Sequence, residues 1–312
     1  AVAAGLSAYM GHFGAGWTTP LATKALAVAV IGVMGWVNYR GVRLGAWASD
    51  ALTIAKLIPL AAFVLIGAFH VQAAQFSPLA PLGWSGLGKA CFLAFFAFSG
   101  FEVVPVPAGE TRSPERAVPK ALVASLLTAA VLYTLVQAVA VGVHPLLAAS
   151  KRPLADAAGL FLGPLGAGFM VLGAAVSNIG FNAGCALGGP RYLVALAEDG
   201  HLPGWLAGRH PAFDTPHRSV ALTAGLTALL AATMDFAKLV DFAIVVICVQ
   251  YLGTCLAVPV LTVGAGPVRR WLAPGLGAAA ALLIASQAGV REALWASAFL
   301  AAGFLLRRLS RP

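Results

Sequence analysis

The feature of this sequence that most constrains its fold is a break signal inside an apolar run long enough to cross a membrane. The run covers residues 87–108, and its centre, FFAFSGFEVVPVP at 95–107, contains a Ser-Gly pair, an acid and two prolines. Each unpaired backbone group costs several kcal/mol in lipid, so non-helical backbone persists there only where protein buries it or where it lines a cavity. We therefore expect a helix that breaks inside the bilayer at Ser99 and Gly100.

The composition also indicates a membrane protein. Of the 312 residues, 60% are hydrophobic and 10% are charged, whereas a soluble domain has about 25% charged residues. We predict an all-α integral membrane protein with about nine full transmembrane helices and one partial helix at residues 1–10. Because Ala1 lies inside this partial run, with no Met or signal peptide before it, we expect the chain to begin within a helix. The full runs cover residues 22–38, 46–69, 87–108, 117–143, 155–187, 218–234, 237–263, 268–288 and 290–306. The longest stretch outside them, residues 188–217, is expected to connect two membrane spans.

The basic residues predict the orientation. Of the 20 Lys and Arg residues, 13 fall in one set of alternate loops, 6 fall in the other set and one, Lys56, lies inside a run. Cytoplasmic loops carry the excess of Lys and Arg, so the richer set and the C-terminus should be cytoplasmic in a multi-pass cell-membrane protein. The net charge of +9 is spread over these short loops, which does not indicate a nucleic-acid partner. The richer set comprises Arg40, Arg43, Arg112, Arg116, Lys120, Arg191, Arg209, Arg218, Arg269, Arg270, Arg307, Arg308 and Arg311.

Two charged residues, Lys56 and Glu102, are expected at membrane depth. If the second run starts near Gly45, Lys56 is 11 residues further on, about 16 Å deep. A lysine in the middle of the hydrocarbon layer is functional by default. The alternative is a helix that starts later and leaves Lys56 near the cytoplasmic headgroups. Glu102 follows the expected break, where a carboxyl can cap a half-helix amide or take up a proton.

The remaining reactive residues do not form a catalytic or metal-binding pattern. The six histidines fall in loops or at the edges of runs, and neither HExxH nor GxSxG occurs. Repeated pore motifs typical of a channel are also absent. We therefore predict a protein that is not an enzyme and has no cofactor or metal. The four cysteines are expected to be small buried hydrophobic residues: Cys91, Cys185, Cys248 and Cys255.

Three segments carry a family resemblance. Residues 95–121 (FFAFSGFEVVPVPAGETRSPERAVPKA) resemble the sixth helix and following cytoplasmic loop of amino acid permeases in the amino acid, polyamine and organocation transporter superfamily. Residues 38–56, which begin NYRGV, resemble the junction of helices four and five. Residues 191–203 (RYLVALAEDGHLP), with Thr215-Pro216 later, resemble the cytoplasmic segment after helix eight. The resemblance extends over the whole chain, as the end of helix three through helix twelve.

This resemblance implies a fold of two inverted five-helix repeats and two additional helices, with the substrate held between broken helices one and six. Residues 1–312 would form a single transporter domain that lacks the first two helices, and residues 87–263 would form a complete second repeat. The missing first helix would carry the glycine-rich break that binds the substrate's carboxylate.

The resemblance also assigns roles at the break. Phe96 matches an aromatic residue that covers the bound substrate, although packing is the usual role of a membrane phenylalanine. Ser99, Gly100 and Phe101 match the unwound segment, whose carbonyl groups would accept hydrogen bonds from an α-ammonium group.

Other matched positions lie on helices five and eight. Lys56 matches a lysine whose ammonium, in some relatives, stands where sodium binds in sodium-coupled members, and burial could let such a group exchange a proton. Lys56 and Glu102 are our candidate coupling residues. Helix eight supplies candidate contacts that could equally be hydrogen bonds between helices: Ser177, Asn178 and Asn182.

The predicted function is secondary active transport of an amino acid, sodium-independent and either proton-coupled or by exchange. The alternatives are transport of a related amine or polyamine, and a non-transporting membrane sensor with the same fold. The sequence does not distinguish among amino acids, between symport and exchange, or among oligomeric states.

Overall fold

The computed structural model describes residues 1–41, 43–78, 83–103, 113–264 and 266–309, and every regular element in these ranges is helical. The chain divides into two compact units. The first unit contains Ala1–Pro81 and Gly100–Phe236. The second unit contains Leu82–Ser99 and Ala237–Leu309.

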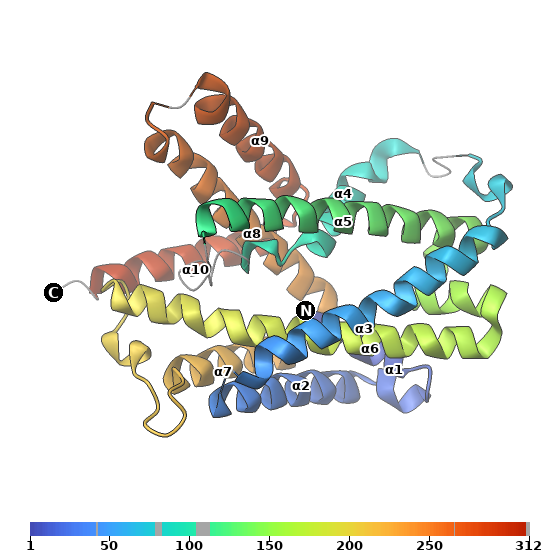
Figure 1. The fold of residues 1–312 in the computed structure, drawn as a ribbon, viewed down its shortest axis with the longest axis horizontal. Helices are drawn as coiled ribbons and strands as arrows, with labels where there is room; N and C mark the ends of the chain where they lie inside the picture. The colour runs from blue at the N-terminus through green and yellow to red at the C-terminus, as the bar shows by residue number, and fades with distance from the viewer. Residues whose placement is uncertain (42, 79–82, 104–112, 265, 310–312) are drawn as a thin grey trace. The chain divides into compact units, whose positions relative to one another are not determined.

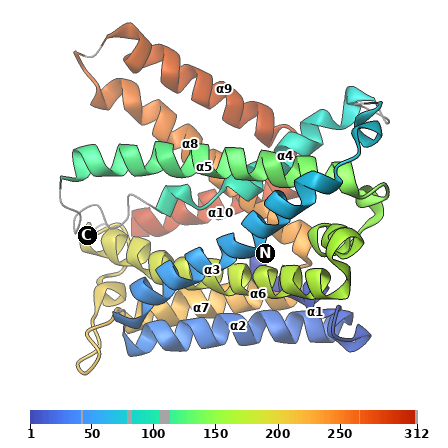
Figure 2. The same ribbon diagram turned by 45° about the vertical axis from the view of Figure 1, so that its right-hand side comes forward.

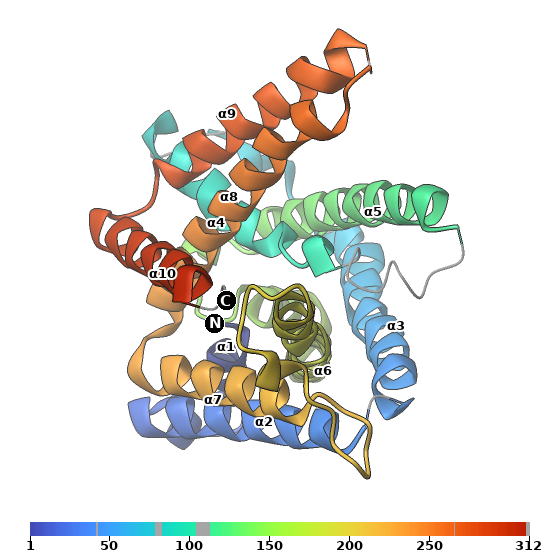
Figure 3. The same ribbon diagram turned by 90° about the vertical axis from the view of Figure 1, so that its left-hand side faces the viewer.

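Helix α6 lies at the centre of the first unit, where it contacts the other five helices. Figure 3 shows α3 on one side of α6 and the pair α2 and α7 on another. In Figures 1 and 2, α2 and α7 run side by side. The helices of this unit are α1 (Val2–Met10), α2 (Pro20–Arg40), α3 (Arg43–Gly67), α5 (Pro114–Val143), α6 (Pro153–Glu198) and α7 (His217–Thr233).

Helix α6 is longer than the run from which it was predicted. Gly163 has non-helical dihedral angles, φ 65° and ψ −162°, and separates a short first segment from the main helix. The main helix then continues to Glu198, beyond the predicted end of the apolar run at residue 187. Residues 193–197 (LVALA) include good helix formers, which favour this extension. The helix ends before Gly200, whose φ of 73° suits a residue after a helix C-terminus.

Close approach of α3 and α6 depends on a glycine facing a proline. Gly173 is buried on α6, and a Cβ atom added there would lie 2.6 Å from Cγ of Pro59 on α3. The adjoining hydrophobic core is built from α3, α5 and α6. Its buried members are Phe63, Val136, Val139, Ala140, Val143, Ala155, Ala157, Ala158, Met170 and Val171.

Two buried hydroxyl groups tie the connection between α6 and α7 to its neighbours. Thr215 Oγ1 donates to the carbonyl of Tyr39 at the end of α2, at 2.8 Å. Ser219 Oγ donates to the carbonyl of Leu206, also at 2.8 Å. Both residues are at most 1% exposed, so each hydrogen bond satisfies a polar group that water does not reach.

In the second unit, side chains of α4 contact α8. Lys89 on α4 forms an ion pair of 3.4 Å with Asp241 on α8, and the ring of Phe95 meets that of Tyr251 edge-on. Figures 1 and 3 show α8 and α9 as an antiparallel pair. The helices are α4 (Leu87–Phe98), α8 (Phe236–Leu261), whose first residue belongs to the first unit, α9 (Ala273–Ala285) and α10 (Val290–Leu309).

Within the described residues, six helical segments are long and apolar enough to cross a membrane. Their most apolar windows are only 11% to 28% buried, so much of their apolar surface requires lipid or further protein around it. The expected total of nine spans stays a prediction. Cys248 is buried as expected, but the expectation was wrong for Cys91 and Cys185, which are exposed. An apolar run does not distinguish a lipid-facing position from a core position, because both are apolar.

Gly173→Ala should destabilise the protein by about 1–3 kcal/mol, because the added methyl group meets the rigid ring of Pro59. The control is Gly184→Ala, on the same helix, where a Cβ atom meets nothing within 4 Å. The temperature at which the monodisperse size-exclusion peak is lost should fall only for the first variant. Equal temperatures for the two variants would contradict the close packing of α3 on α6.

Candidate functional site

The helix break expected from the sequence is present. Helix α4 ends at Phe98, Ser99 is extended with ψ 154°, and Gly100 has a φ of 114°, a conformation that favours glycine. One short 3-10 turn, η5 (Phe101–Val103), follows. The two prolines expected to take part, at positions 105 and 107, lie outside the described residues. The boundary between the two units falls between Ser99 and Gly100.

Side chains satisfy part of the backbone at this break. The amide and the hydroxyl of Ser99 both donate to the carbonyl of Phe96, at 3.1 and 2.7 Å. The Gly100 amide donates to Oε2 of Glu102 at 2.8 Å. Of the two roles left open for Glu102, its carboxylate has the capping geometry, and its role in coupling stays a prediction.

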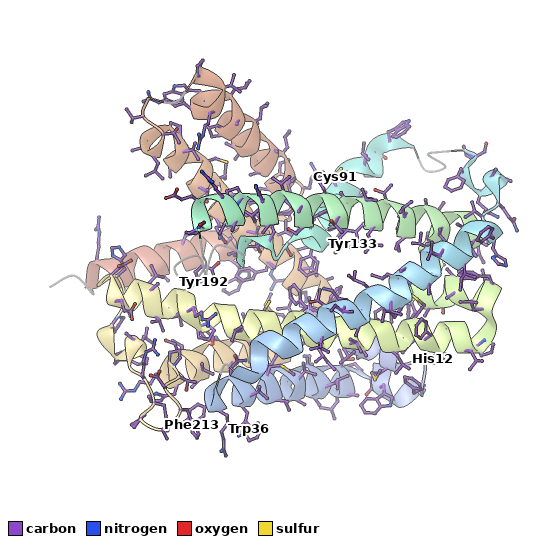
Figure 4. All side chains as sticks on the ribbon, in the orientation of Figure 1. His12, Trp36, Cys91, Tyr133, Tyr192 and Phe213 are labelled. Carbon is purple, nitrogen blue, oxygen red and sulfur yellow. The ribbon has the colours of Figure 1, made fainter. Side chains whose placement is uncertain are left out.

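The turn after the break contacts α6. A Cβ atom on Gly100 would lie 3.7 Å from Cε2 of Phe181. The hydroxyl of Tyr192 donates to the backbone carbonyl of Glu102 at 3.1 Å, and Figure 4 shows Tyr192 on α6. Tyr192 was not among the site residues predicted from the sequence, because it lies in the stretch outside the expected membrane runs. Its partner is 90 residues away along the chain, so no local pattern indicated the contact.

The aromatic residues at the break are half-buried. Phe96 lies on the last turn of α4, and Phe101 begins η5. The C-terminal end of α4 carries the partial negative charge of its last carbonyl groups. A cation is therefore the favoured ligand at this end.

Lys56 lies in the middle of α3 and is half-buried. The helix begins at Arg43, and the depth of Lys56 in the membrane stays a prediction. Within the described residues, Lys56 forms neither a hydrogen bond nor an ion pair, with Glu102 or with any other residue. One turn later, Pro59 leaves the carbonyl of Ala55 without its usual helical partner. This part of α3 thus has a cation and a carbonyl group at neighbouring positions.

The candidate residues on α6 form a short polar row. Asn182 Nδ2 donates to the carbonyl and to Oδ1 of Asn178, at 2.8 and 3.0 Å. Asn178, which is 9% exposed, donates to the carbonyl of Val2 on α1. The sequence left two roles open for these residues, a substrate contact or a hydrogen bond between helices. Asn178 forms a hydrogen bond of the second kind. Ser177 is half-buried and forms no hydrogen bond within the described residues.

A cavity of about 180 Å³ lies between α2, α6 and α7, and Asn182 is on its wall. The lining is largely apolar, and pockets of this kind bind through shape and a few polar groups. The other lining residues are Ile31, Met34, Gly35, Cys185, Ala186, Gly189, Val220, Thr223, Ala224 and Thr227. In the described part of the chain, no three His, Cys, Asp or Glu side chains are grouped to hold a metal ion.

Comparison with known proteins places these features in a family. A family model described as amino acid permease matches residues 1–308. The chain is 32% identical over 243 residues to an uncharacterized transporter of Mycobacterium tuberculosis, which covers 74% of this chain and 54% of the relative. It is 30% identical over 266 residues to the branched-chain amino acid permease BcaP of Bacillus subtilis, or 77% of this chain and 56% of the relative.

A further similarity is to a methylthioribose transporter of Bacillus subtilis, at 27% identity over 217 residues, 68% of this chain and 46% of the relative. The chain thus spans about half the length of the curated relatives that it matches. All three relatives are named as transporters or permeases. Together with the six apolar helices and the broken helix at Ser99 and Gly100, the family match over residues 1–308 shows that this chain belongs to the amino acid permease family.

Proposed function

We propose that the full-length gene product is a secondary active transporter that carries an amino acid through a site at the Ser99–Gly100 break. The observation that carries this proposal is the interruption of an apolar helix by extended backbone at Ser99 and a φ of 114° at Gly100. In membrane transporters, broken helices of this kind place helix ends and polar backbone against the substrate.

The backbone groups at the break favour the ammonium end of an amino acid over its carboxylate end. The carbonyl end of α4 suits an α-ammonium group. The Gly100 amide is already bonded to the Glu102 carboxylate, so this amide is not available to a substrate carboxylate. A ligand that has an ammonium group but no carboxylate, such as an amine or polyamine, could therefore also use this end. Competition binding between amino acids and amines or polyamines distinguishes these substrate classes.

Lys56 supports a sodium-independent mechanism. A half-buried ammonium in the middle of α3, without a carboxylate partner among the described residues, supplies a fixed positive charge. A fixed cation of this kind can replace a bound sodium ion, and it can exchange a proton if burial favours its neutral form. We therefore propose that transport is either proton-coupled or by substrate exchange, and that Lys56 is a coupling residue.

The first experiment tests the substrate site. In the full-length protein reconstituted in liposomes, Phe96→Ala should weaken amino acid binding about tenfold, or ~1.4 kcal/mol, because the aromatic cover over the site is lost. Equilibrium binding of radiolabelled branched-chain and other amino acids measures this, with methylthioribose as a competitor. Leu93→Ala, an exposed position on the same helix, is the control. Unchanged affinity would assign Phe96 to packing, and a parent protein that binds an amino acid but does not take it up would favour the sensor function.

The second experiment separates the two roles of the α6 asparagine row. Asn178→Ala removes the bonds to Val2 and Asn182 and should cost about 1–3 kcal/mol of stability. The neighbouring variant Ser177→Ala removes no hydrogen bond within the described residues and should melt at the parent's temperature. We expect substrate affinity to be unchanged in both. Weaker binding by Asn178→Ala at unchanged stability would instead identify a substrate contact.

The third experiment concerns coupling. Uptake should proceed without sodium, and Lys56→Met should abolish its pH dependence, because the variant keeps most of the stem and removes the charge. Lys24→Met on α2 is the matched control and should retain the parent's pH profile. Transport that requires sodium, or a pH profile unaltered by Lys56→Met, would rule this mechanism out.

A further inference from the structure

Helix α6 contacts the break at Gly100 and the turn after it at Glu102. Phe181 lies against Gly100, where a Cβ atom would be 3.7 Å from the ring. Tyr192, three helical turns further along α6, donates its hydroxyl to the carbonyl of Glu102 at 3.1 Å. The first contact is van der Waals only, so the Tyr192 bond is the directional one of the two.

Glu102 accepts a hydrogen bond from Gly100 and another from Tyr192, with different parts of the residue. Its carboxylate accepts from the Gly100 amide and shapes the break locally. Its backbone carbonyl accepts from Tyr192 and connects the turn to α6. The second bond therefore does not depend on the side chain at position 102. This bond connects Tyr192 to η5 and not to α4, so Tyr192 supports η5.

The Tyr192 side chain is suited to a bond that breaks and reforms. Tyr192 is 41% exposed, so the ring can swing away without opening a cavity in a packed core. By contrast, Thr215, which also donates to a backbone carbonyl, is 1% exposed and held in place. A single neutral hydrogen bond changes a two-state equilibrium by about threefold to tenfold, which is enough to bias a conformational change without blocking it.

We propose that Tyr192 is a positioning residue that holds η5 against α6 and keeps the cytoplasmic side of the break closed until the bond opens during transport. The inference rests on the proposed function. Transporters of this class alternate access by moving one part of the protein against another around the site. Gly100, with a φ of 114°, has a conformation that favours glycine immediately before η5, and we take it as the pivot.

The direction of the effect follows from the predicted orientation. The chain after η5 leads to the basic residues Arg116 and Lys120, which are expected on the cytoplasmic side. Loss of the Tyr192 bond should therefore expose the break to reagents from the cytoplasm. Exposure from the opposite side should stay the same or decrease.

The test uses a cysteine at the break. In the full-length protein with its native cysteines replaced by alanine, Ser99→Cys is labelled by a membrane-impermeant maleimide applied to either side of oriented vesicles. Tyr192→Phe should raise the cytoplasmic labelling rate about threefold to tenfold, since it removes only the hydroxyl. The control is Tyr39→Phe, whose hydroxyl forms no hydrogen bond within the described residues. A cytoplasmic rate unchanged from the parent, or equal increases from both sides, would overturn the proposal.

A second background identifies the acceptor. Glu102→Gln keeps the backbone carbonyl, so Tyr192→Phe should raise the cytoplasmic rate by the same factor in that background. A smaller factor would show that Tyr192 acts through the carboxylate, contrary to the proposal. Amino acid binding by the parent is measured separately. If the parent binds no amino acid but Tyr192→Phe raises the cytoplasmic labelling rate, only the proposed function is contradicted. If the parent binds an amino acid but the labelling rate is unchanged, only the Tyr192 proposal is contradicted.

Discussion

The structure depends on how the backbone is satisfied where an apolar helix stops at Phe98. In a membrane-spanning segment, no solvent replaces the hydrogen bonds that the helix loses. Two side chains near the break take over part of that role. The Ser99 hydroxyl donates to the carbonyl of Phe96, and the Glu102 carboxylate accepts from the Gly100 amide. These local hydrogen bonds satisfy part of the extended backbone at the break, and they leave the carbonyl end of α4 as the part suited to a cation.

Helix α6 provides the fixed support for the elements around it. It packs closely on α3 through Gly173 and Pro59, and it bonds to α1 through Asn178. The same helix reaches the turn after the break through Tyr192. Its buried contacts are with α3 and α1, whereas the contact with the break is exposed. This difference in burial explains why we assign a structural role to Asn178 and a movable one to Tyr192.

The sequence predicted much of the site that depends on neighbouring residues. The Ser-Gly pair within an apolar run predicted the break, and one of the two roles considered for Glu102 was the cap now seen at the Gly100 amide. It did not predict Tyr192, because the hydrogen bond joins residues 90 positions apart. It also did not choose between a substrate contact and a packing role for Asn178. That choice depends on the position of Val2, which belongs to another helix.

By itself, the sequence determined the membrane class, the approximate position of most helices, the break and the family, because hydropathy and backbone chemistry act over short stretches of chain. The tertiary structure decided which faces of those helices are covered. It extended α6 to Glu198, left Cys91 and Cys185 exposed, and placed Lys56 mid-helix without a carboxylate partner among the described residues. The physical reason is that lipid and protein core are both apolar, so a sequence of apolar residues does not specify which of the two surrounds a side chain.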